Sequence, residues 1–427
     1  MSPPQRWLLH RRLAQALEAQ HPGTEDEVAA QLAEQYRLSG DPDRAIGYFV
    51  AAGDAATHIF ANARAVADYQ CGLDLLAGTV PERDTREREL EVLLRMPPPL
   101  TALRGYSSPQ LRATLERIIE LSGSLGRPRV LASGLIGLFA ATFVQGQTAM
   151  SHGLASRALK LTAAMPDLLG QANFAVAGAA TSLGRLGEAL AHFDLAFEQA
   201  PDTHTYILGT RIEVHARAWA SHARWLTGDD DGAMGLSAEA VDRATVAEHP
   251  YSLAVALAYR AVLLQMRLGS GAGGAGRPGG AEELARLAAE LEALCTRYHF
   301  AYYGHWGAIL RGWLAGGEPG IAVIEAAIGD LGASLAYARM PYWRSLLAQA
   351  LLGGGRPRDA RAVLAAAESA AYRRSDVWWL PEILRQHALL EPLSAARPML
   401  VRAHTLAGEQ GSLMLAGRVR STAQQLG

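Results

Sequence analysis

Residues 174–201 read FAVAGAATSLGRLGEALAHFDLAFEQAP, a pattern typical of two short helices joined at a glycine. The first predicted helix carries the small residues Ala177 and Ala180 and ends at Gly184, and Pro201 is predicted to close the second. The second helix repeats its contact residues at i, i+4 and i+7, which share one helical face: Ala189, Phe193 and Ala196. Small side chains let two antiparallel helices approach closely, and one large ring then fills the groove between them.

The same pattern recurs along the chain, with a glycine five residues before the first alanine of each second helix. The four pairs are Gly40 and Ala45, Gly184 and Ala189, Gly228 and Ala233, and Gly355 and Ala360. A weaker copy lies at Gly146, Ala155 and Ala158. This is the pattern of tetratricopeptide-type helical hairpins, and signals for β-strands are nearly absent. The sequence therefore predicts an all-α fold, an α-solenoid of antiparallel hairpins with roughly 20 helices.

The chain has 427 residues, which is long for one compact domain but not for a solenoid, whose repeats contact only their neighbours. We predict one solenoid over residues 1–427. Its predicted parts are N-terminal repeats (1–80), central repeats (81–268), a flexible Gly-rich linker (269–280), and C-terminal repeats with a cap (281–427). The linker contains GAGGAG, a literal match to GxGxxG. No strand precedes it, so no dinucleotide site is predicted there.

Composition narrows the possible functions. The net charge is −2 and the pI is about 6.7, which favours neither nucleic acid nor an anionic membrane as a direct partner. Cys71 and Cys295 lie far apart and form no metal or disulfide framework, so a cytoplasmic location is expected. The longest apolar run, residues 130–144, is too short to span a bilayer. HExxH, CxxC and GxSxG are all absent, and the sequence predicts no catalytic residue, cofactor or metal site.

Several stretches together carry a resemblance to a known family. They are LLHRRLAQALE, GDPDRAIGYFVAAGDAA, CGLDLLAG, LRGYSSPQ, HPYSLAVALAYRA, LRGWLAGGEPGIAVI and WWLPEILRQHALLE. In this order the chain resembles the C-terminal tetratricopeptide-like region of large bacterial ATP-binding regulators of the LuxR type and related signalling ATPases. The resemblance implies that the chain binds a partner or inducer.

The sequence also departs from that family. Lys160 is the only lysine and follows Leu159, so the chain has no GK[ST] motif for a phosphate-binding loop. No C-terminal helix-turn-helix is evident either. We therefore expect a sensor or scaffold part, either stand-alone or excised from a larger regulator.

The stretch YHFAYYGHW, residues 298–306, holds five aromatic rings and two imidazoles. Tyr303, Trp306 and Trp313 fall on one predicted helical stripe. Such a stripe packs between helices in most hairpins. A shift of one residue in the start of the repeat would instead turn it toward the concave groove. The sequence leaves both interpretations open.

A second candidate stripe lies in RIEVHARAWASHARWL. It holds Arg211, His215, His222 and Trp225, opposite the packing face that Ala233 and its hairpin partners define. In the family that the chain resembles, first helices line the concave surface, so this stripe is a candidate site for an anionic peptide or aromatic ligand. The alternative is a solvated face. His215 and His222 are two turns apart, too far to share one metal without further ligands.

The leading hypothesis is a non-enzymatic sensor or scaffold module of a bacterial regulatory system that binds a protein partner or small effector in its concave groove. The alternative is a small-molecule-binding biosynthetic protein or enzyme with an aromatic pocket. Besides Tyr298–Trp313, the rings Tyr342, Trp343, Trp378 and Trp379 motivate it. Self-association through an apolar end of the solenoid is a third possibility, although the final helix has the polar character of a cap.

Overall fold

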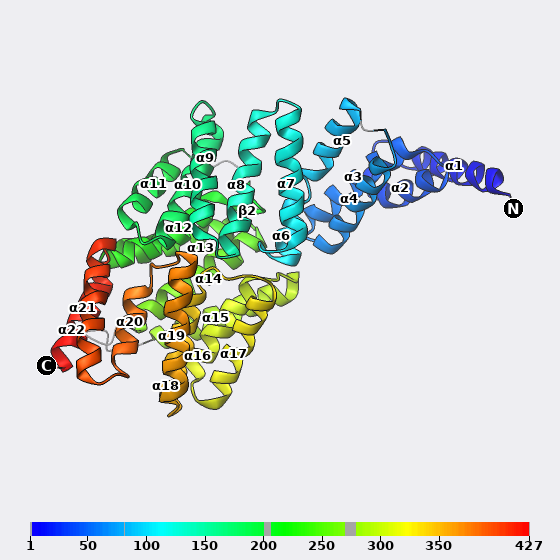
Figure 1. Ribbon diagram of the computed structural model, residues 1–427. Coiled ribbons are helices and arrows are strands. Elements are labelled where there is room, and N and C mark those ends of the chain that lie inside the picture. Colours follow the sequence, from blue (N-terminus) through cyan, green and yellow to red (C-terminus); the bar gives the residue numbers. More distant parts are fainter. Residues whose placement is uncertain (1, 81, 200–205, 270–278, 427) are drawn as a thin grey trace. The chain divides into compact units, whose positions relative to one another are not determined.

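The computed structural model describes residues 2–80, 82–199, 206–269 and 279–426 of the chain. These residues form 22 α-helices, one 3-10 helix and one two-stranded sheet (Figure 1). The helices follow one another in consecutive packed pairs. The prediction of an all-α fold of tetratricopeptide-like hairpins is therefore confirmed.

The chain divides into two compact units, residues 1–104 with 109–134 (unit 1) and residues 105–108 with 135–427 (unit 2). Helix α8 (Pro128–Val144) begins in unit 1 and ends in unit 2. The other elements of unit 1 are α1 (Pro3–Gln20), η1 (Glu25–Val28), α2 (Ala29–Leu38), α3 (Pro42–His58), α4 (Asn62–Ala77), α5 (Arg83–Leu93), α6 (Pro97–Arg104) and α7 (Pro109–Ser124).

Unit 2 continues the pattern of paired helices. Its first half contains α9 (Thr148–Thr162), α10 (Pro166–Ser182), α11 (Leu186–Gln199), β1 (Tyr206–Ile207), β2 (Thr210–Arg211), α12 (Ile212–Leu226), α13 (Asp230–Val246) and α14 (Pro250–Leu268). Its second half contains α15 (Gly280–Tyr298), α16 (Tyr303–Ala315), α17 (Gly317–Ala333), α18 (Met340–Gly353), α19 (Pro357–Arg374), α20 (Leu380–Ala388), α21 (Leu393–Gln410) and α22 (Leu413–Leu426).

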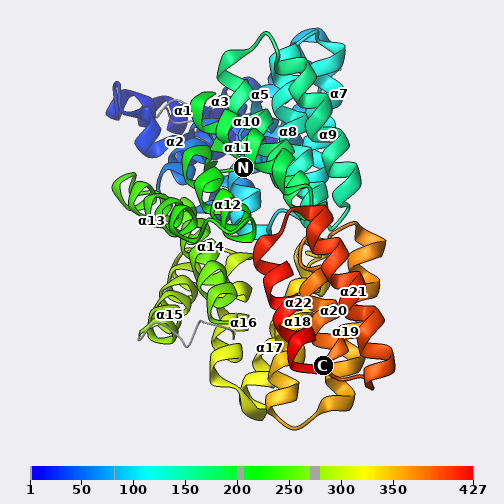
Figure 2. The same cartoon turned by 90° about the vertical axis from the view of Figure 1, so that its left-hand side faces the viewer.

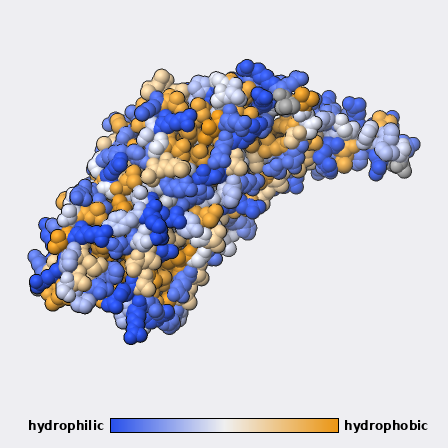
Figure 3. Space-filling view, in the orientation of Figure 1, coloured by the Kyte–Doolittle hydropathy of each residue, from blue (hydrophilic) through white to orange (hydrophobic). Residues whose placement is uncertain are grey.

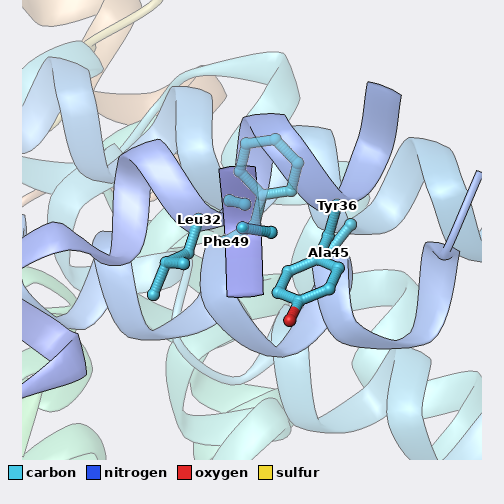
Figure 4. Close-up of a cluster of buried hydrophobic side chains, with 6 residues drawn as sticks. Leu32, Tyr36, Ala45 and Phe49 are labelled. Carbon is cyan, nitrogen blue, oxygen red and sulfur yellow. The ribbon is translucent and has the colours of Figure 1, made fainter. Parts of the chain in front are cut away.

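The hairpin of α2 and α3 shows how the repeat builds a core in unit 1. Leu32 and Tyr36 of α2 pack with Ala45 and Phe49 of α3, and all four side chains are buried (Figure 4). Because Ala45 is small, α3 approaches α2 closely, and the ring of Phe49 fills the space beside it. The carboxylate of Asp41 accepts the backbone N–H of Arg44, the third residue of α3, which starts this helix where the repeat requires it.

The four glycines predicted to end first helices all have positive φ: Gly40 (74°), Gly184 (73°), Gly228 (99°) and Gly355 (73°). Glycine adopts this left-handed conformation without the penalty that a Cβ atom brings. The alanines five residues later are fully buried in all four hairpins. The predicted contact between small residues is therefore confirmed.

A tight hairpin precedes α12. β1 and β2 pair antiparallel with Tyr206 opposite Arg211, and the turn residues Leu208 and Gly209 both have positive φ, as a two-residue turn of this type requires. α12 therefore begins at Ile212. The prediction that Arg211 belongs to the helical stripe is wrong, because Arg211 lies in β2 and precedes the first turn of the helix.

Unit 2 also closes on itself, which the repeat pattern did not predict. Three later connections donate hydrogen bonds to carbonyls at the ends of three earlier helices: Tyr337 and Ala338 to Val144 of α8 (2.8 and 3.0 Å), Val377 to Ser182 of α10 (2.8 Å), and Ser412 to Leu226 of α12 (3.4 Å). α22 lies beside α20 and also contacts α12 (Figure 2). The last helices thus cover a face that an open solenoid would leave exposed.

Some predictions fall on other parts of the chain. Pro201 and residues 270–278, most of the predicted linker 269–280, lie outside the described residues. The division into 1–80, 81–268 and 281–427 stays a prediction. Within the described ranges, no helix combines the length and hydropathy needed to cross a membrane. Hydrophobic and hydrophilic areas are interspersed on the face shown in Figure 3, and α1 exposes Trp7 and Leu8 (56 % and 51 %).

Candidate functional site

Helix α12 is buried on almost every side, because α10, α11, α13, α14 and α22 pack around it. Its predicted stripe therefore lies inside unit 2. His215 is 8 % exposed, and His222 and Trp225 are fully buried. The alternative of a solvated face is wrong for these three residues, since other helices of unit 2 cover the side that the α12–α13 hairpin leaves open.

A cavity of about 30 Å³ lies inside unit 2. By volume it has room for about two water molecules. Separate hairpins supply its wall, which includes Phe143 of α8, Phe174 of α10, Trp219 of α12 and Tyr259 of α14. The cavity therefore exists only where these repeats meet, and no single hairpin contains it.

Three of the seven predicted site residues border this cavity: His215, Tyr303 and Trp306. The rings of Tyr303 and Trp306 lie 5.2 Å apart in edge-to-face contact, and both side chains are buried. The packing interpretation describes the burial of these two rings, and their place in a binding groove stays a prediction. These rings pack between helices of unit 2 and also line a hollow.

The other four predicted residues do not line the cavity. Their places are as follows: Trp225 packs 6.4 Å from Trp379, the half-buried Trp313 donates its indole N–H to Gln349 (2.8 Å), Arg211 pairs with Glu213 (3.2 Å), and His222 lies behind the wall, in contact with Tyr259 and Arg339. Their partners all belong to unit 2. The burial of Trp225 and His222 gives them a packing role in this fold.

The rings of the later hairpins converge as well. Trp306 of α16 lies 5.1 Å from Trp343 of α18, and Tyr342 lies 5.2 Å from Trp379. Trp343 and Trp379 are fully buried. These rings form a continuous packed core beside the cavity, so only part of the aromatic density of the sequence faces an empty space.

The sequence analysis missed most of the wall of the cavity, including Arg339, the arginine that borders it. Arg339 lies directly before α18 and is 3 % exposed. Its guanidinium carbon lies 5.0–5.8 Å from four ring centroids: Trp219 (5.8 Å), Tyr259 (5.0 Å), Trp306 (5.4 Å) and Trp378 (5.1 Å). Cation–π attraction stabilises such an arrangement. In the sequence it stands between Ala338 and the helix-starting pair Met340–Pro341, with no charge pattern to mark it.

Hydrogen bonds fix the protonation state of the His222 imidazole. Its Nε2 lies 2.8 Å from the carbonyl oxygen of Tyr259 and must donate there, while Nδ1 lies 3.2 Å from Nη1 of Arg339 and must accept. His222 is therefore neutral. Burial and the charge of Arg339 lower its pKa well below the usual value, and for the same reasons the pKa of His215 is lowered to about 3.

The same burial keeps the phenol of Tyr259 in its neutral, protonated form. Burial raises its pKa to about 12, although the nearby Arg339 charge opposes the shift. General acid–base catalysis is most effective when the pKa of the group lies near the working pH. His215 and Tyr259 thus stay neutral near pH 7, and the wall supplies ring faces, neutral hydrogen-bonding groups and one cation.

Unit 1 contains a wider hollow of about 420 Å³ between α4, α5 and α7. Polar and charged residues line much of it. The guanidinium of Arg117 is paired there with Glu89 at 2.8 Å. Thr79 and Thr85 border it on either side of residue 81, which lies outside the described residues. We therefore take the cavity of unit 2, whose wall is fully described, as the candidate site.

Comparison with known proteins finds a relative in sequence and similar folds among solved structures. No family model matches the chain. An uncharacterized protein of Rhizobium meliloti (strain 1021) is 25 % identical over 447 aligned positions, which cover 99 % of this chain and 42 % of that protein. The chain thus spans less than half the length of this curated relative.

Two solved structures resemble the chain. A Rap protein complexed with competence and sporulation factor has a TM-score of 0.51 and 12 % identity, covering 89 % of this chain and 98 % of that one. A signal transduction ATPase with numerous domains that carries a tetratricopeptide repeat sensor, from Pyrococcus horikoshii, has a TM-score of 0.45 and 12 % identity, covering 80 % and 50 %. The chain is therefore a tetratricopeptide-like helical repeat protein with the fold of the Rap structure.

Proposed function

We propose that the chain is a non-enzymatic sensor module of a bacterial regulatory system and that it binds a small effector in the cavity of unit 2. The observation that carries the proposal is the cavity itself, whose wall comes from α8, α10, α12, α14, α16 and the connection before α18. Ligand sites in proteins are hollows lined mostly by apolar and aromatic groups, with few polar ones. The Rap structure, of the same fold, holds a bound factor.

The cavity adjoins one of the hydrogen bonds that close unit 2, so a ligand bound there acts on the closure of the unit. Val144, Ala338 and Arg339 all border the cavity. The backbone N–H of Ala338 also donates to the carbonyl of Val144 (3.0 Å), one of the bonds that close unit 2. An effector in contact with both sides of this bond would stabilise the closed arrangement over an open one, which is how a ligand shifts a conformational equilibrium.

The enclosed, ring-lined hollow also suits the alternative function, a biosynthetic enzyme. Acid–base chemistry would need a group with a pKa near neutrality, whereas burial lowers the pKa of His215 to about 3 and raises that of Tyr259 to about 12. We therefore favour binding over turnover. Chemical change of the bound ligand would distinguish the enzyme from the sensor directly.

The test is a thermal-shift screen of the purified chain against bacterial metabolites, repeated with Ala140→Leu. Ala140 borders the cavity at 9 % exposure, and leucine there would fill the hollow while leaving the repeat contacts in place. A true effector raises the melting temperature of the wild type and has no effect on the variant, because a ligand that binds only the folded state stabilises it.

Mass spectrometry of each such ligand after prolonged incubation then distinguishes the functions. Recovery of the unchanged compound supports the sensor, and accumulation of a product supports the enzyme. If every stabilising compound acts equally on the wild type and Ala140→Leu, the site lies elsewhere and the proposal fails.

A further inference from the structure

We infer that Arg339 is an anion anchor and that the cavity takes the carboxylate group of a small organic acid. The inference rests on the proposed function, because it names the chemistry of the effector that the same cavity would bind. It follows from the surroundings of the buried Arg339, from a comparison with the buried Arg418 of the same unit, and from the backbone conformation of Arg339.

Arg339 has few partners for its charge. Its five guanidinium N–H groups have two neutral side-chain partners, Nδ1 of His222 at 3.2 Å and the hydroxyl of Tyr259. Within the described residues, no carboxylate oxygen lies within 4.0 Å of the guanidinium nitrogens. The carboxylate of Asp376 is buried near it but accepts the backbone N–H of Arg339 (2.9 Å). Aromatic rings attract the cation but do not neutralise it.

Arg418 is a buried arginine of unit 2 with a structural role, and its contacts differ from those of Arg339. Its guanidinium also lies over two rings, those of Trp225 (5.2 Å) and Trp379 (5.5 Å). In addition, the carboxylate of Glu382 lies 3.4 Å away and balances its charge. A buried charge without such a partner is costly. Arg339 has no carboxylate at ion-pair distance from its guanidinium, unlike Arg418, and it borders the cavity.

The backbone of Arg339 is held in an unusual conformation, which it shares with six other non-glycine residues at helix ends and turns of the described chain. The φ of Arg339 is 60°, in the left-handed region that disfavours residues with a side chain. Strained residues of this kind persist where the surrounding structure holds them, and they gather at binding sites. Here the strain lies at the residue whose guanidinium borders the cavity.

The size of the cavity limits the anion. A hollow of about 30 Å³, equal to about two waters, accepts a carboxylate with a very short apolar chain, and a longer body requires the wall to move. No residue of the wall is more than 9 % exposed, so entry also requires local opening. Binding that requires a conformational change is slower than simple docking. Carboxylates suit this guanidinium because its paired N–H groups match the two oxygens.

The test compares acetate with acetamide, which has nearly the same shape and no charge. Both are titrated into the full chain at constant pH and ionic strength while tryptophan fluorescence is recorded, since Trp219 and Trp306 line the cavity. We expect acetate to give a saturable signal and acetamide to bind at least about tenfold more weakly, as the loss of a charged hydrogen-bond pair predicts. Arg339→Gln should abolish this preference.

Arg402→Gln is the matched control, because Arg402 lies over the ring of Tyr372 (5.1 Å) but is 53 % exposed and remote from the cavity wall. It should keep the preference for acetate. If Arg339→Gln does not fold, Ala140→Leu serves instead and should lose the acetate signal. Equal binding of acetate and acetamide to the wild type would overturn the inference and leave the effector site standing. The absence of any acetate signal that Ala140→Leu removes would overturn the inference, whereas the proposed function fails only if no compound of the metabolite screen discriminates the wild type from Ala140→Leu.

Discussion

At the scale of single residues, Asp376 shows how burial can make a charge costly. It is 2 % exposed, and one of its carboxylate oxygens has no hydrogen-bond partner in the part of the chain that the structure describes. Burial raises its pKa to about 6 from 3.8, even though the Arg339 charge and hydrogen bonds oppose the shift. The protonated acid is therefore favoured in the folded state relative to the unfolded chain.

Asp376→Asn tests this account. A group whose folded pKa is raised stabilises the fold fully below its unfolded pKa, and this stability is lost as the pH rises through the folded value. We expect the free energy of unfolding of the wild type to fall relative to the variant between about pH 4 and pH 6, by up to about 3 kcal/mol. Urea unfolding of both proteins at several pH values measures the difference. Parallel pH profiles would show that Asp376 ionises normally in the fold.

At the scale of elements, two glycine bends of the repeat have different surroundings. One lies against a connection that closes unit 2, and the other does not. Gly184 has a positive φ, and a Cβ atom placed there would lie 2.9 Å from Cγ of Gln410 at the end of α21. Gln410 in turn donates to the carbonyl of Val377 (2.8 Å), at the connection that bonds to α10. Gly355 has the same φ of 73°, and nothing lies within 4 Å of an added Cβ atom there.

The pair Gly184→Ala and Gly355→Ala therefore isolates the closing contact. Each variant should lose about 1–2 kcal/mol of stability because alanine disfavours the left-handed conformation. Gly184→Ala should lose at least about 1 kcal/mol more, since its methyl group displaces Gln410 from a close-packed site. Chemical unfolding of both variants gives the comparison, and equal losses would mean that the contact of Gln410 contributes nothing measurable.

The helices themselves were predictable because their signals are local. Gly184 and Ala189 lie five residues apart, and the sequence reveals the bend and the buried face without knowledge of anything distant. The candidate site was not predictable in the same way. Tyr303 and Trp306 form a visible stripe, whereas Arg339 borders the cavity through rings that come from α12, α14, α16 and the turn before α20. Which hairpins meet depends on the winding of unit 2, and no local spacing encodes it.

At the scale of unit 2, closure changes how the repeats share stability. In an open solenoid each repeat contacts only its neighbours, so the removal of the last one leaves distant repeats unaffected. Here α22 contacts both α20 and α12, and Ser412 bonds to the end of α12. Arg418 also ties α22 to the carbonyl of Met266 at the end of α14 and to the buried Glu382 of α20. Arg385 and Arg418 more than offset the effect of burial and lower the pKa of Glu382 to about 2.

A chain that ends at Glu391, without α21 and α22, tests this coupling. We expect faster amide hydrogen exchange in α12, even though the deleted helices follow it by more than a hundred residues, because α22 no longer packs on α12 and the carbonyl of Leu226 loses the Ser412 hydroxyl. Exchange in α2 and α3 of unit 1 should stay unchanged and serves as the internal control. Hydrogen-exchange mass spectrometry reports each helix separately. Unchanged protection of α12 would mean that unit 2 behaves as an open array, in which each repeat is stabilised by its sequence neighbours alone.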